Sequence, residues 1–217
     1  AVGLQIDGSV SQAVVEHNRI SGTNAGIEIV QATDTVLSSN IVRSEKIGIK
    51  WNAEVTGSGH ISNNDISGEL IGVLYGAPGN LSSNTIHDSA VGVQVGITTA
   101  DAPALILGST VGSIANMIRD NVIGIDVRQT VIDQHIVGND VGVIGPGQLG
   151  DETWDSPNRI ERNTVGSRVS GTVQFNHFVD NTTGIETTDQ QLIAHNVVTG
   201  EGLVGIIASG VTGSRIV

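Results

Sequence analysis

Arginine and histidine side chains recur at fixed offsets behind a series of asparagines, and their chemistry suits the binding of anions. The residues with this potential are Arg19, Arg43, Arg119, Arg159 and His177. A guanidinium group binds a carboxylate or a sulfate through two parallel hydrogen bonds. In a chain of formal net charge −12, such a stripe predicts contact with an acidic polysaccharide.

A smaller set of residues suggests a reaction on such a ligand. The candidates for catalysis are His87, Arg119 and His135. A histidine beside an arginine-bound uronate can remove the proton next to the carboxylate, while the arginine stabilises the developing enolate. This chemistry is β-elimination, the reaction of a polysaccharide lyase. The alternative is that these side chains only provide the polar surface that outward strand positions need.

Hydrolysis of a glycosidic bond is a weaker expectation, because it needs two carboxyl groups about 5 to 10 Å apart. The sequence contains no two adjacent aspartates. Asp88, Asp120 and Asp180 each lie four residues after one of the asparagines, but Gly138 and Arg162 hold that position in the repeats between them. Aspartate is favoured in turns, where its side chain bonds to the local backbone. A turn role is therefore preferred.

Two long insertions interrupt the regular spacing, near 96–115 and 145–157. In the first, the apolar stretch 104–107 predicts an added strand. The second is rich in Gly and Pro, which predicts a surface loop, and it contains Asp151, Glu152 and Asp155. Their carboxylates suit Ca²⁺, so calcium is a candidate cofactor. The alternative is a tolerated surface bulge, and no other cofactor is indicated.

The asparagines belong to an internal repeat, and this repeat must position the candidate residues. Its frame is Asn-x-Ile-x5-Gly, where Val or Phe can replace the Ile. The anchor asparagines are Asn18, Asn40, Asn64, Asn84, Asn116, Asn158, Asn176 and Asn196. Gln134 takes the place of the anchor once, and successive anchors lie 18 to 32 residues apart, most often near 22.

Each column of the repeat has a physical interpretation. Apolar residues recur two places after the anchor, three places before it and one place after the glycine, which predicts three short strands per repeat with one buried face. Trp51 and Tyr75, three places after a glycine, share the inward parity and are expected to be core rings rather than a sugar platform. The anchors are expected to form an amide ladder, because a buried amide is costly without a partner. The glycine is expected to make a bend at positive φ.

This pattern resembles the right-handed parallel β-helix repeat, which is shared by pectate-lyase-like enzymes and by secreted and surface proteins of bacteria. The resemblance implies an all-β fold, a single-stranded right-handed parallel β-helix of about ten coils of about 22 residues. It covers nearly all of 1–217, which is expected to be one domain. In the enzymes of this family the outer faces of the strands form the substrate groove, which would place the arginine and histidine stripe outside.

Composition limits the classes of partner. The net charge of −12 argues against nucleic acid, whose binding needs clustered Lys and Arg. No apolar run approaches the 18 residues of a membrane span. The chain has no Cys, so stability must come from packing and hydrogen bonds rather than disulfides.

The expected function is a structural rod or fibre segment of a secreted or cell-surface bacterial protein, such as an adhesin, stalk or filament, and glycan binding is a further expectation. The sequence starts and stops within repeats, so a segment of a longer protein is expected, and uncapped strand edges predict end-to-end association. One alternative is a lyase- or epimerase-like enzyme acting on an acidic polysaccharide. A second alternative is a fibre of the phage tailspike type.

Overall fold

The computed structural model describes residues 1–8, 10–52, 59–76, 79–95, 106–107, 114–153, 155–187, 192–200, 202–208 and 215–216. Every regular element in these ranges is a β-strand, and all strand pairs are parallel. Across the same ranges, no helix of the length and apolarity needed to cross a membrane is found. The prediction of an all-β parallel solenoid is confirmed.

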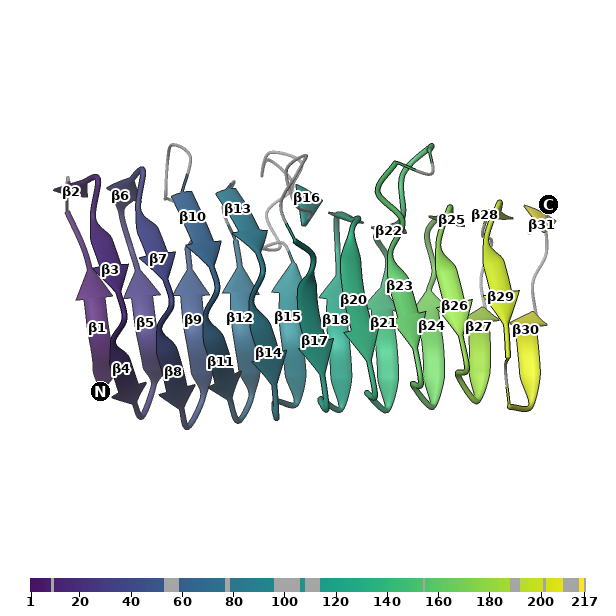
Figure 1. Cartoon of the computed structure of the whole chain (residues 1–217), viewed down its shortest axis with the longest axis horizontal. Helices are drawn as coiled ribbons and strands as arrows, with labels where there is room; N and C mark the ends of the chain where they lie inside the picture. The colour runs from purple at the N-terminus through teal and green to yellow at the C-terminus, as the bar shows by residue number, and fades with distance from the viewer. Residues whose placement is uncertain are drawn as a thin grey trace.

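The strands stack into long sheets that run the length of the molecule (Figure 1). The ten-stranded sheet contains β1 (Val2–Ile6), β5 (Ala25–Ile29), β9 (Ile47–Trp51), β12 (Ile71–Tyr75), β15 (Val91–Val95), β18 (Ile123–Val127), β21 (Val141–Gly145), β24 (Val165–Val169), β27 (Thr183–Thr187) and β30 (Val204–Ala208). The nine-stranded sheet contains β4 (Arg19–Gly22), β8 (Ile41–Ser44), β11 (Asp65–Gly68), β14 (Thr85–His87), β17 (Asn116–Arg119), β20 (Gln134–Val137), β23 (Arg159–Glu161), β26 (His177–Val179) and β29 (Val197–Thr199).

The third side of the solenoid is divided into shorter sheets. A four-stranded sheet contains β3 (Val14–Glu16), β7 (Val36–Ser38), β10 (Gly59–Ser62) and β13 (Gly79–Ser82). A six-stranded sheet contains β16 (Ile106–Leu107), β19 (Thr130–Val131), β22 (Gln148–Leu149), β25 (Val173–Gln174), β28 (Leu192–Ala194) and β31 (Arg215–Ile216). A further pair consists of β2 (Val10–Ser11) and β6 (Ala32–Thr33).

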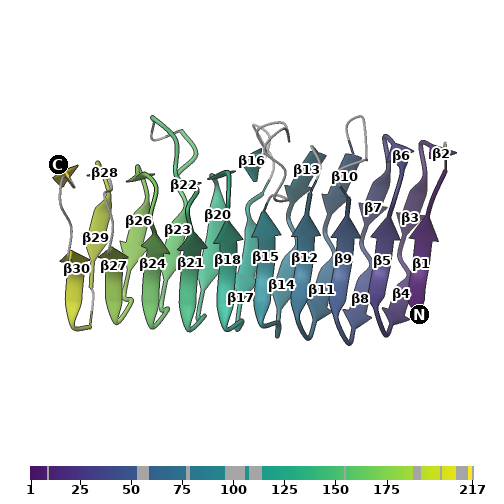
Figure 2. The same cartoon turned by 180° about the vertical axis from the view of Figure 1, so that it is seen from behind.

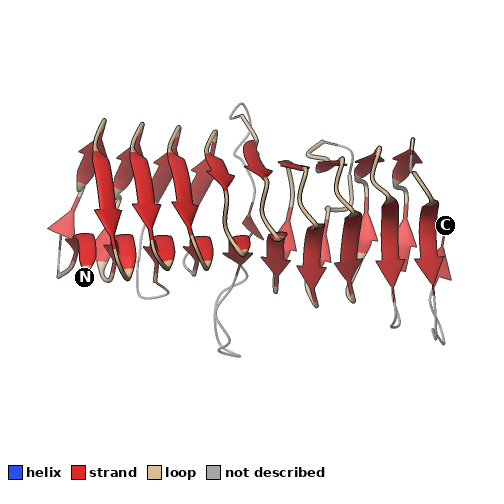
Figure 3. Cartoon of the chain, turned by 90° about the horizontal axis from the view of Figure 1, so that it is seen from below, coloured by secondary structure: helices blue, strands red, loops and turns tan. Residues whose placement is uncertain are grey.

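The chain visits these sheets in a fixed order, so that each coil lies beside the one before it. One coil runs from the ten-stranded sheet through the third side to the nine-stranded sheet and back. Viewed from behind, the coils still follow chain order between the two termini (Figure 2). Seen from below, the strands form separate rows with the interior between them (Figure 3).

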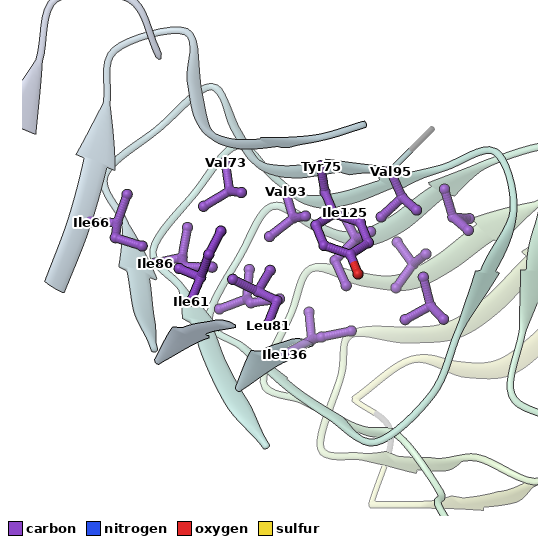
Figure 4. Packing of buried hydrophobic residues seen from close by; sticks show 14 of the residues in the cluster. Ile61, Ile66, Val73, Tyr75, Leu81, Ile86, Val93, Val95, Ile125 and Ile136 are labelled. Atoms are coloured by element: carbon purple, nitrogen blue, oxygen red, sulfur yellow. The ribbon is translucent and has the colours of Figure 1, made fainter. Parts of the chain in front are cut away.

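The interior is built from files of equivalent apolar residues, as the repeat predicts. Ile66, Ile86 and Ile118 are neighbours in register across β11, β14 and β17, and all three are fully buried. Figure 4 shows side chains from different sheets, such as Val73 and Leu81, pointing into the same interior. Burial of one such side chain contributes about 1.5 to 3 kcal/mol, so the stacked files are the main source of stability.

The two largest rings also lie inside, which confirms their assignment to the core. Trp51 is fully buried and Tyr75 is 2% exposed, in neighbouring positions of β9 and β12. Gly59 makes room for the indole, because a Cβ there would lie 1.9 Å from Cη2 of Trp51. The hydroxyl of Tyr75 donates a hydrogen bond of 2.6 Å to the carbonyl oxygen of Gly79. Glycines on the third side therefore provide the space that these two large rings need.

The anchor asparagines form a ladder between the third side and the nine-stranded sheet, which is buried except at its two ends, and Asn64 illustrates its contacts. Its Oδ1 accepts hydrogen bonds from the backbone N (2.9 Å) and Nδ2 (3.0 Å) of Asn40. Its Nδ2 donates to the carbonyl oxygens of Leu37 and Ser62, both at 2.9 Å, and to Oδ1 of Asn84 at 3.0 Å. Similar contacts join Asn18, Asn40, Asn64, Asn84 and Asn116, and then Asn158, Asn176 and Asn196.

Gln134 keeps the ladder continuous with a longer side chain. Its Oε1 accepts from Nδ2 of Asn116 at 2.8 Å, and its Nε2 turns to the carbonyl oxygens of Ile132 and Asp133 in its own coil. The next step is made by the backbone N of Gln134, which donates to Oδ1 of Asn158 at 3.0 Å.

The repeat glycines have a different role from the one expected. They lie inside the strands of the ten-stranded sheet, as Gly72 does in β12, and none of them has a positive φ. A Cβ on Gly72 would lie 2.6 Å from both the carbonyl oxygen of Gly92 and Cγ2 of Ile86. Close approach of the next coil, and not a bend, therefore requires glycine.

Bends are made instead at two corners, and the first of them is at the residue directly before the anchor. This residue has a φ between 50° and 58° in His17, Ser39, Asn63, Ser83, Asp133, Phe175 and His195. Left-handed backbone costs an L-residue roughly 1 to 2 kcal/mol, so strain occurs both at the position four places after the anchor, which holds Asp88, Asp120, Arg162 and Asp180, and at this corner before the anchor. The rings of Phe175 and His195 stack there with centroids 4.8 Å apart.

One insertion differs from the sequence expectation, and part of the other agrees with it. The range 145–157 was expected to be one loop, but it contains Gln148 and Leu149 as strand β22. Leu149 is fully buried and pairs with Val131 and Val173. It takes the core position that a fixed spacing assigns to Asp155. The expected strand at 104–107 is present as β16 over Ile106–Leu107, and most of 96–115 lies outside the described residues.

Candidate functional site on the outer face of the nine-stranded sheet

The stripe predicted from the sequence lies on the outer face of the nine-stranded sheet, in two files. The first file contains Arg19, Ile41, Asp65, Thr85, Met117, His135, Arg159, His177 and Val197. The second file contains Ser21, Arg43, Ser67, His87, Arg119, Val137, Glu161, Val179 and Thr199. Parallel pairing places neighbours in a file about 4.8 Å apart, so charged side chains of successive coils meet.

One group of charges joins Arg43, Asp65, His87 and Asp88. Nη2 of Arg43 lies 2.9 Å from Oδ1 of Asp65, and its Nη1 donates to the backbone carbonyl oxygens of Val42 and Asp65, both at 2.9 Å. Nε2 of His87 lies 2.6 Å from Oδ1 of Asp65, and its Nδ1 lies 2.6 Å from Oδ2 of Asp88. The imidazole thus bridges two carboxylates from neighbouring coils.

This bridge determines what His87 can do. Both ring nitrogens of His87 therefore lie at hydrogen-bond distance from a carboxylate oxygen. Burial raises the pKa of Asp65, but hydrogen bonds from His87 and Arg43 outweigh this effect, and the pKa lies below its usual value. In this arrangement neither ring nitrogen of His87 is free to contact a substrate.

Arg119 is also held by a carboxylate. Its Nη1 is paired with Oδ2 of Asp120, the next residue in the chain. Arg119 and His87 are neighbours in the second file, whereas His135 lies in the first file between Met117 and Arg159. The structure therefore brings two of the three proposed catalytic side chains together and places the third in the other file.

The densest group is the Glu161 cluster, which consists of Glu161, His135, Arg159 and Arg162. Oε2 of Glu161 accepts a hydrogen bond of 2.6 Å from Nε of Arg159 and lies 2.5 Å from Nη2 of the same arginine. Its Oε1 lies 2.9 Å from Nη2 of Arg162 and 3.1 Å from Nε2 of His135. The Glu161 side chain is only 8% exposed, while those of Arg159 and Arg162 are 53% and 65% exposed.

The electrostatics of this cluster keep Glu161 ionised. Burial raises its pKa, but the neighbouring His135 and Arg159 side chains more than compensate, and the pKa lies below its usual value. One carboxylate thus faces two guanidinium groups and one imidazole. The charge of the cluster is positive, in contrast to the groups around Arg43 and Arg119.

The remaining members of the predicted ligand-binding set lie near the two ends of the face. Arg19 is exposed on β4, and His177 follows Arg159 in register on β26. A shallow hollow covers the first coils of the same face. Its lining includes Ser21, Thr23, Arg43, Ser44, Glu45 and Ser67.

The proposed calcium ligands form a turn. Oδ1 of Asp151 accepts a hydrogen bond of 2.9 Å from the backbone N of Thr153, and the Thr153 hydroxyl lies 3.3 Å from the backbone N of Asp155. Within the described ranges, no three acidic or imidazole side chains are arranged to hold a metal ion. Calcium binding at Asp151, Glu152 and Asp155 stays a prediction.

A second asparagine ladder was missed in the sequence. Oδ1 of Asn121 accepts from the backbone N of Ser89 at 3.0 Å, and three further steps of 2.9 to 3.1 Å follow. Its members are Asn121, Asn139, Asn163 and Asn181, each five residues after an anchor position. That recurrence is visible in the sequence once Gln134 is accepted as an anchor.

Glu161 and Arg162 were also missed as partners. The sequence shows Glu161 as an outward residue and Arg162 as an interruption of the turn aspartates, but it does not show that both residues join Arg159 in one cluster.

In comparisons of the chain with protein-family models, curated proteins and solved structures, no match was found.

Proposed function

We propose that this chain is a structural rod segment, and that it works outside a bacterial cell, as do the surface and secreted proteins that its repeat resembles. The observation that carries the proposal is the unbroken register of the ten-stranded sheet from β1 to β30. Each coil contacts mainly its two neighbours, so length can be changed by adding or removing coils. Such a body suits a stalk or spacer.

The charge pairing on the outer face favours this role over catalysis. His87 is bridged by two carboxylates, and Arg119 is paired with Asp120. A lyase needs an arginine that is available to the substrate carboxylate and a base with a free lone pair. Among the described residues, each proposed catalytic side chain instead lies beside a carboxylate. His87 contacts Asp65 and Asp88, Arg119 contacts Asp120, and His135 lies beside Glu161.

Deletion of a whole coil tests the rod. Removing 117–134, the 18 residues between Asn116 and His135, keeps the ladder in phase and is expected to leave a folded, cooperative protein that is shorter by about 4.8 Å. Removing only 117–125 shifts every later file and is expected to abolish folding. Loss of folding in the whole-coil deletion would argue against a modular rod. Circular dichroism and small-angle scattering provide the two measurements.

The enzyme alternative is tested by incubation with polygalacturonate, alginate and glycosaminoglycans. A rod is expected to release no unsaturated uronic products. Products that disappear in the double variant Arg119→Gln, His135→Gln would overturn the proposal in favour of a lyase. End-to-end association and a trimeric fibre stay predictions, which sedimentation at increasing concentration addresses.

A further inference from the structure

We infer that the Glu161 cluster is an oxyanion-binding site, in which the exposed guanidinium groups of Arg159 and Arg162 bind a sulfate or carboxylate group of a polyanion. The inference goes beyond the proposed rod and does not depend on it. The ligand is defined by its chemistry: an anionic oxygen group with at least two acceptor atoms, carried on a polymer or free in solution.

Charge balance separates this cluster from its neighbours on the same face. Arg159 and Arg162 contribute two positive charges against the single carboxylate of Glu161, so the cluster carries +1 with His135 neutral. The group around Arg43 contains two carboxylates, Asp65 and Asp88, for one guanidinium. The cluster is therefore a local excess of positive charge in a chain of net charge −12.

The geometry leaves some guanidinium N–H donors that are not paired with Glu161. Arg159 uses Nε and Nη2 for Oε2, and Arg162 uses Nη2 for Oε1. An arginine carries five N–H donors in a rigid fork. Nη1 of Arg159, and Nε and Nη1 of Arg162, have no ion pair with another described side chain. Because both side chains are at least half exposed, a ligand can reach these donors.

Glu161 acts as a positioning residue in this arrangement. Its two oxygens fix two flexible arginine side chains at adjacent places before any ligand arrives. Fixing long side chains in advance reduces the conformational entropy that binding would otherwise remove. The carboxylate is itself buried and its two oxygens are occupied, so it presents little negative charge to an approaching anion.

The backbone conformation of Arg162 is an independent reason to assign a function to its side chain. Arg162 has a φ of 53°, in the left-handed region. The equivalent corner positions hold residues that accept this region at lower cost, namely Asp88, Asp120, Gly138, Asp180 and Gly200. Strain at a position is a reason to look for a function of its side chain. Asp180, which holds this position in the following coil, lies with its Oδ1 close to Gly200 of the next coil again.

The test uses matched charge variants of the full chain. Arg159→Gln and Arg162→Gln remove charge from the site, while Arg168→Gln removes the same charge from the ten-stranded sheet, where Arg168 pairs with Glu186 at 2.7 Å. All three change the net charge by the same amount. Inorganic sulfate, dextran sulfate, polygalacturonate and neutral dextran are titrated by calorimetry at low ionic strength, where charge interactions are least screened.

The expected result is saturable binding of at least one anionic probe, about tenfold weaker in each site variant and within about twofold of wild type in Arg168→Gln. Binding of inorganic sulfate with this dependence assigns the site to a free anion, and binding of the polymers alone assigns it to a polysaccharide. Equal weakening in all three variants, or equal binding of neutral dextran, overturns the inference. So does the absence of saturable binding by wild type.

A fourth variant separates loss of binding from loss of fold. Arg162→Gly places a residue that favours positive φ at a position of positive φ, so its unfolding midpoint is expected to equal or exceed that of wild type. Its anion binding is expected to fall as in Arg162→Gln. Retention of full affinity by the folded glycine variant would show that Arg162 is not part of an anion site.

Discussion

The Cβ position of Gly48 lies 2.5 Å from the carbonyl oxygen of Gly72 in the next coil. The same relationship recurs along the ten-stranded sheet, with separations of 2.4 to 2.8 Å from Gly3 to Gly166. A real Cβ cannot occupy such a position without moving a backbone strand. The glycine file therefore sets how closely the coils pack at one edge of the solenoid.

Replacement of a central member of this file should be severe. Gly72→Ala is expected to lower the free energy of unfolding by about 3 kcal/mol, because the new methyl meets backbone and a buried Ile86 at 2.6 Å. The control is Gly205→Ala, where the nearest atom is Cγ1 of Val198 at 3.6 Å. That variant is expected to change stability by less than about 1 kcal/mol. Equal effects in a urea titration would contradict the packing explanation.

The anchor ladder predicts an effect that depends on position. Nδ2 of Asn84 donates to the carbonyl oxygens of Ile61 and Ser82 and to Oδ1 of Asn116, at 2.8 to 2.9 Å. Asn84→Ala removes these three buried hydrogen bonds and is expected to cost about 3 kcal/mol or more. Asn18→Ala, at an exposed position, is expected to cost about 1 kcal/mol. Thermal unfolding of both variants measures the difference, and a similar loss in both would argue against the ladder.

The fold could be predicted because its determinants are local and repeated. The parity of residues such as Ile86 around each anchor specifies one buried face per strand, and the spacing of the anchors specifies the coil. The reason for the glycines could not be predicted, since it depends on the distance between coils. Leu149 shows the second limit: an insertion hides the register, and only pairing with Val131 reveals which residue enters the core.

The candidate site was predictable in its location but not in its pairing. Periodicity alone places Arg43, Arg119 and Arg159 on one outer face. It does not show which carboxylate each arginine meets, because partners come from other coils or from corners with unusual backbone. Asp65 reaches His87 across 22 residues of sequence, and Arg162 reaches Glu161 from a left-handed corner. These contacts decide which charges are available to a ligand.

Ser167 interrupts a buried file of Ile and Val. It pairs with Val143 and Ile185 and is fully buried, and its hydroxyl finds no hydrogen-bond partner in the part of the chain that the structure describes. Ser167→Ala is therefore expected to leave stability unchanged or raise it by up to about 1 kcal/mol. Ser89→Ala is the matched control, since its hydroxyl donates to the His87 carbonyl oxygen at 3.2 Å. Its expected effect is a loss of about 1 kcal/mol, and a larger loss at Ser167 would contradict the assignment.

Glu161 makes stability depend on pH in the acid range. Its pKa in the folded protein lies below the usual value, so its stabilising effect is present above the usual pKa and is lost as pH falls through the folded pKa. Glu161→Gln is expected to be less stable than wild type at pH 7, with a difference that shrinks below about pH 4. Urea titrations at pH 7, 5 and 3 follow this convergence. A difference that is the same at all three pH values would show that charge at Glu161 is not the cause.

Tyr75 makes stability depend on pH in the alkaline range, where stability falls as pH rises. Burial raises its pKa from 10.0 to about 12, so folding keeps a proton that the unfolded chain releases. This contribution is fully present below pH 10 and is lost as pH rises through 12, a loss of about 3 kcal/mol for this difference in pKa. Tyr75→Phe removes the ionisable group and the hydrogen bond to Gly79, so it is expected to be less stable than wild type at pH 8. Its stability should then fall less between pH 10 and 12, and parallel curves for the two proteins would show that another group controls alkaline unfolding.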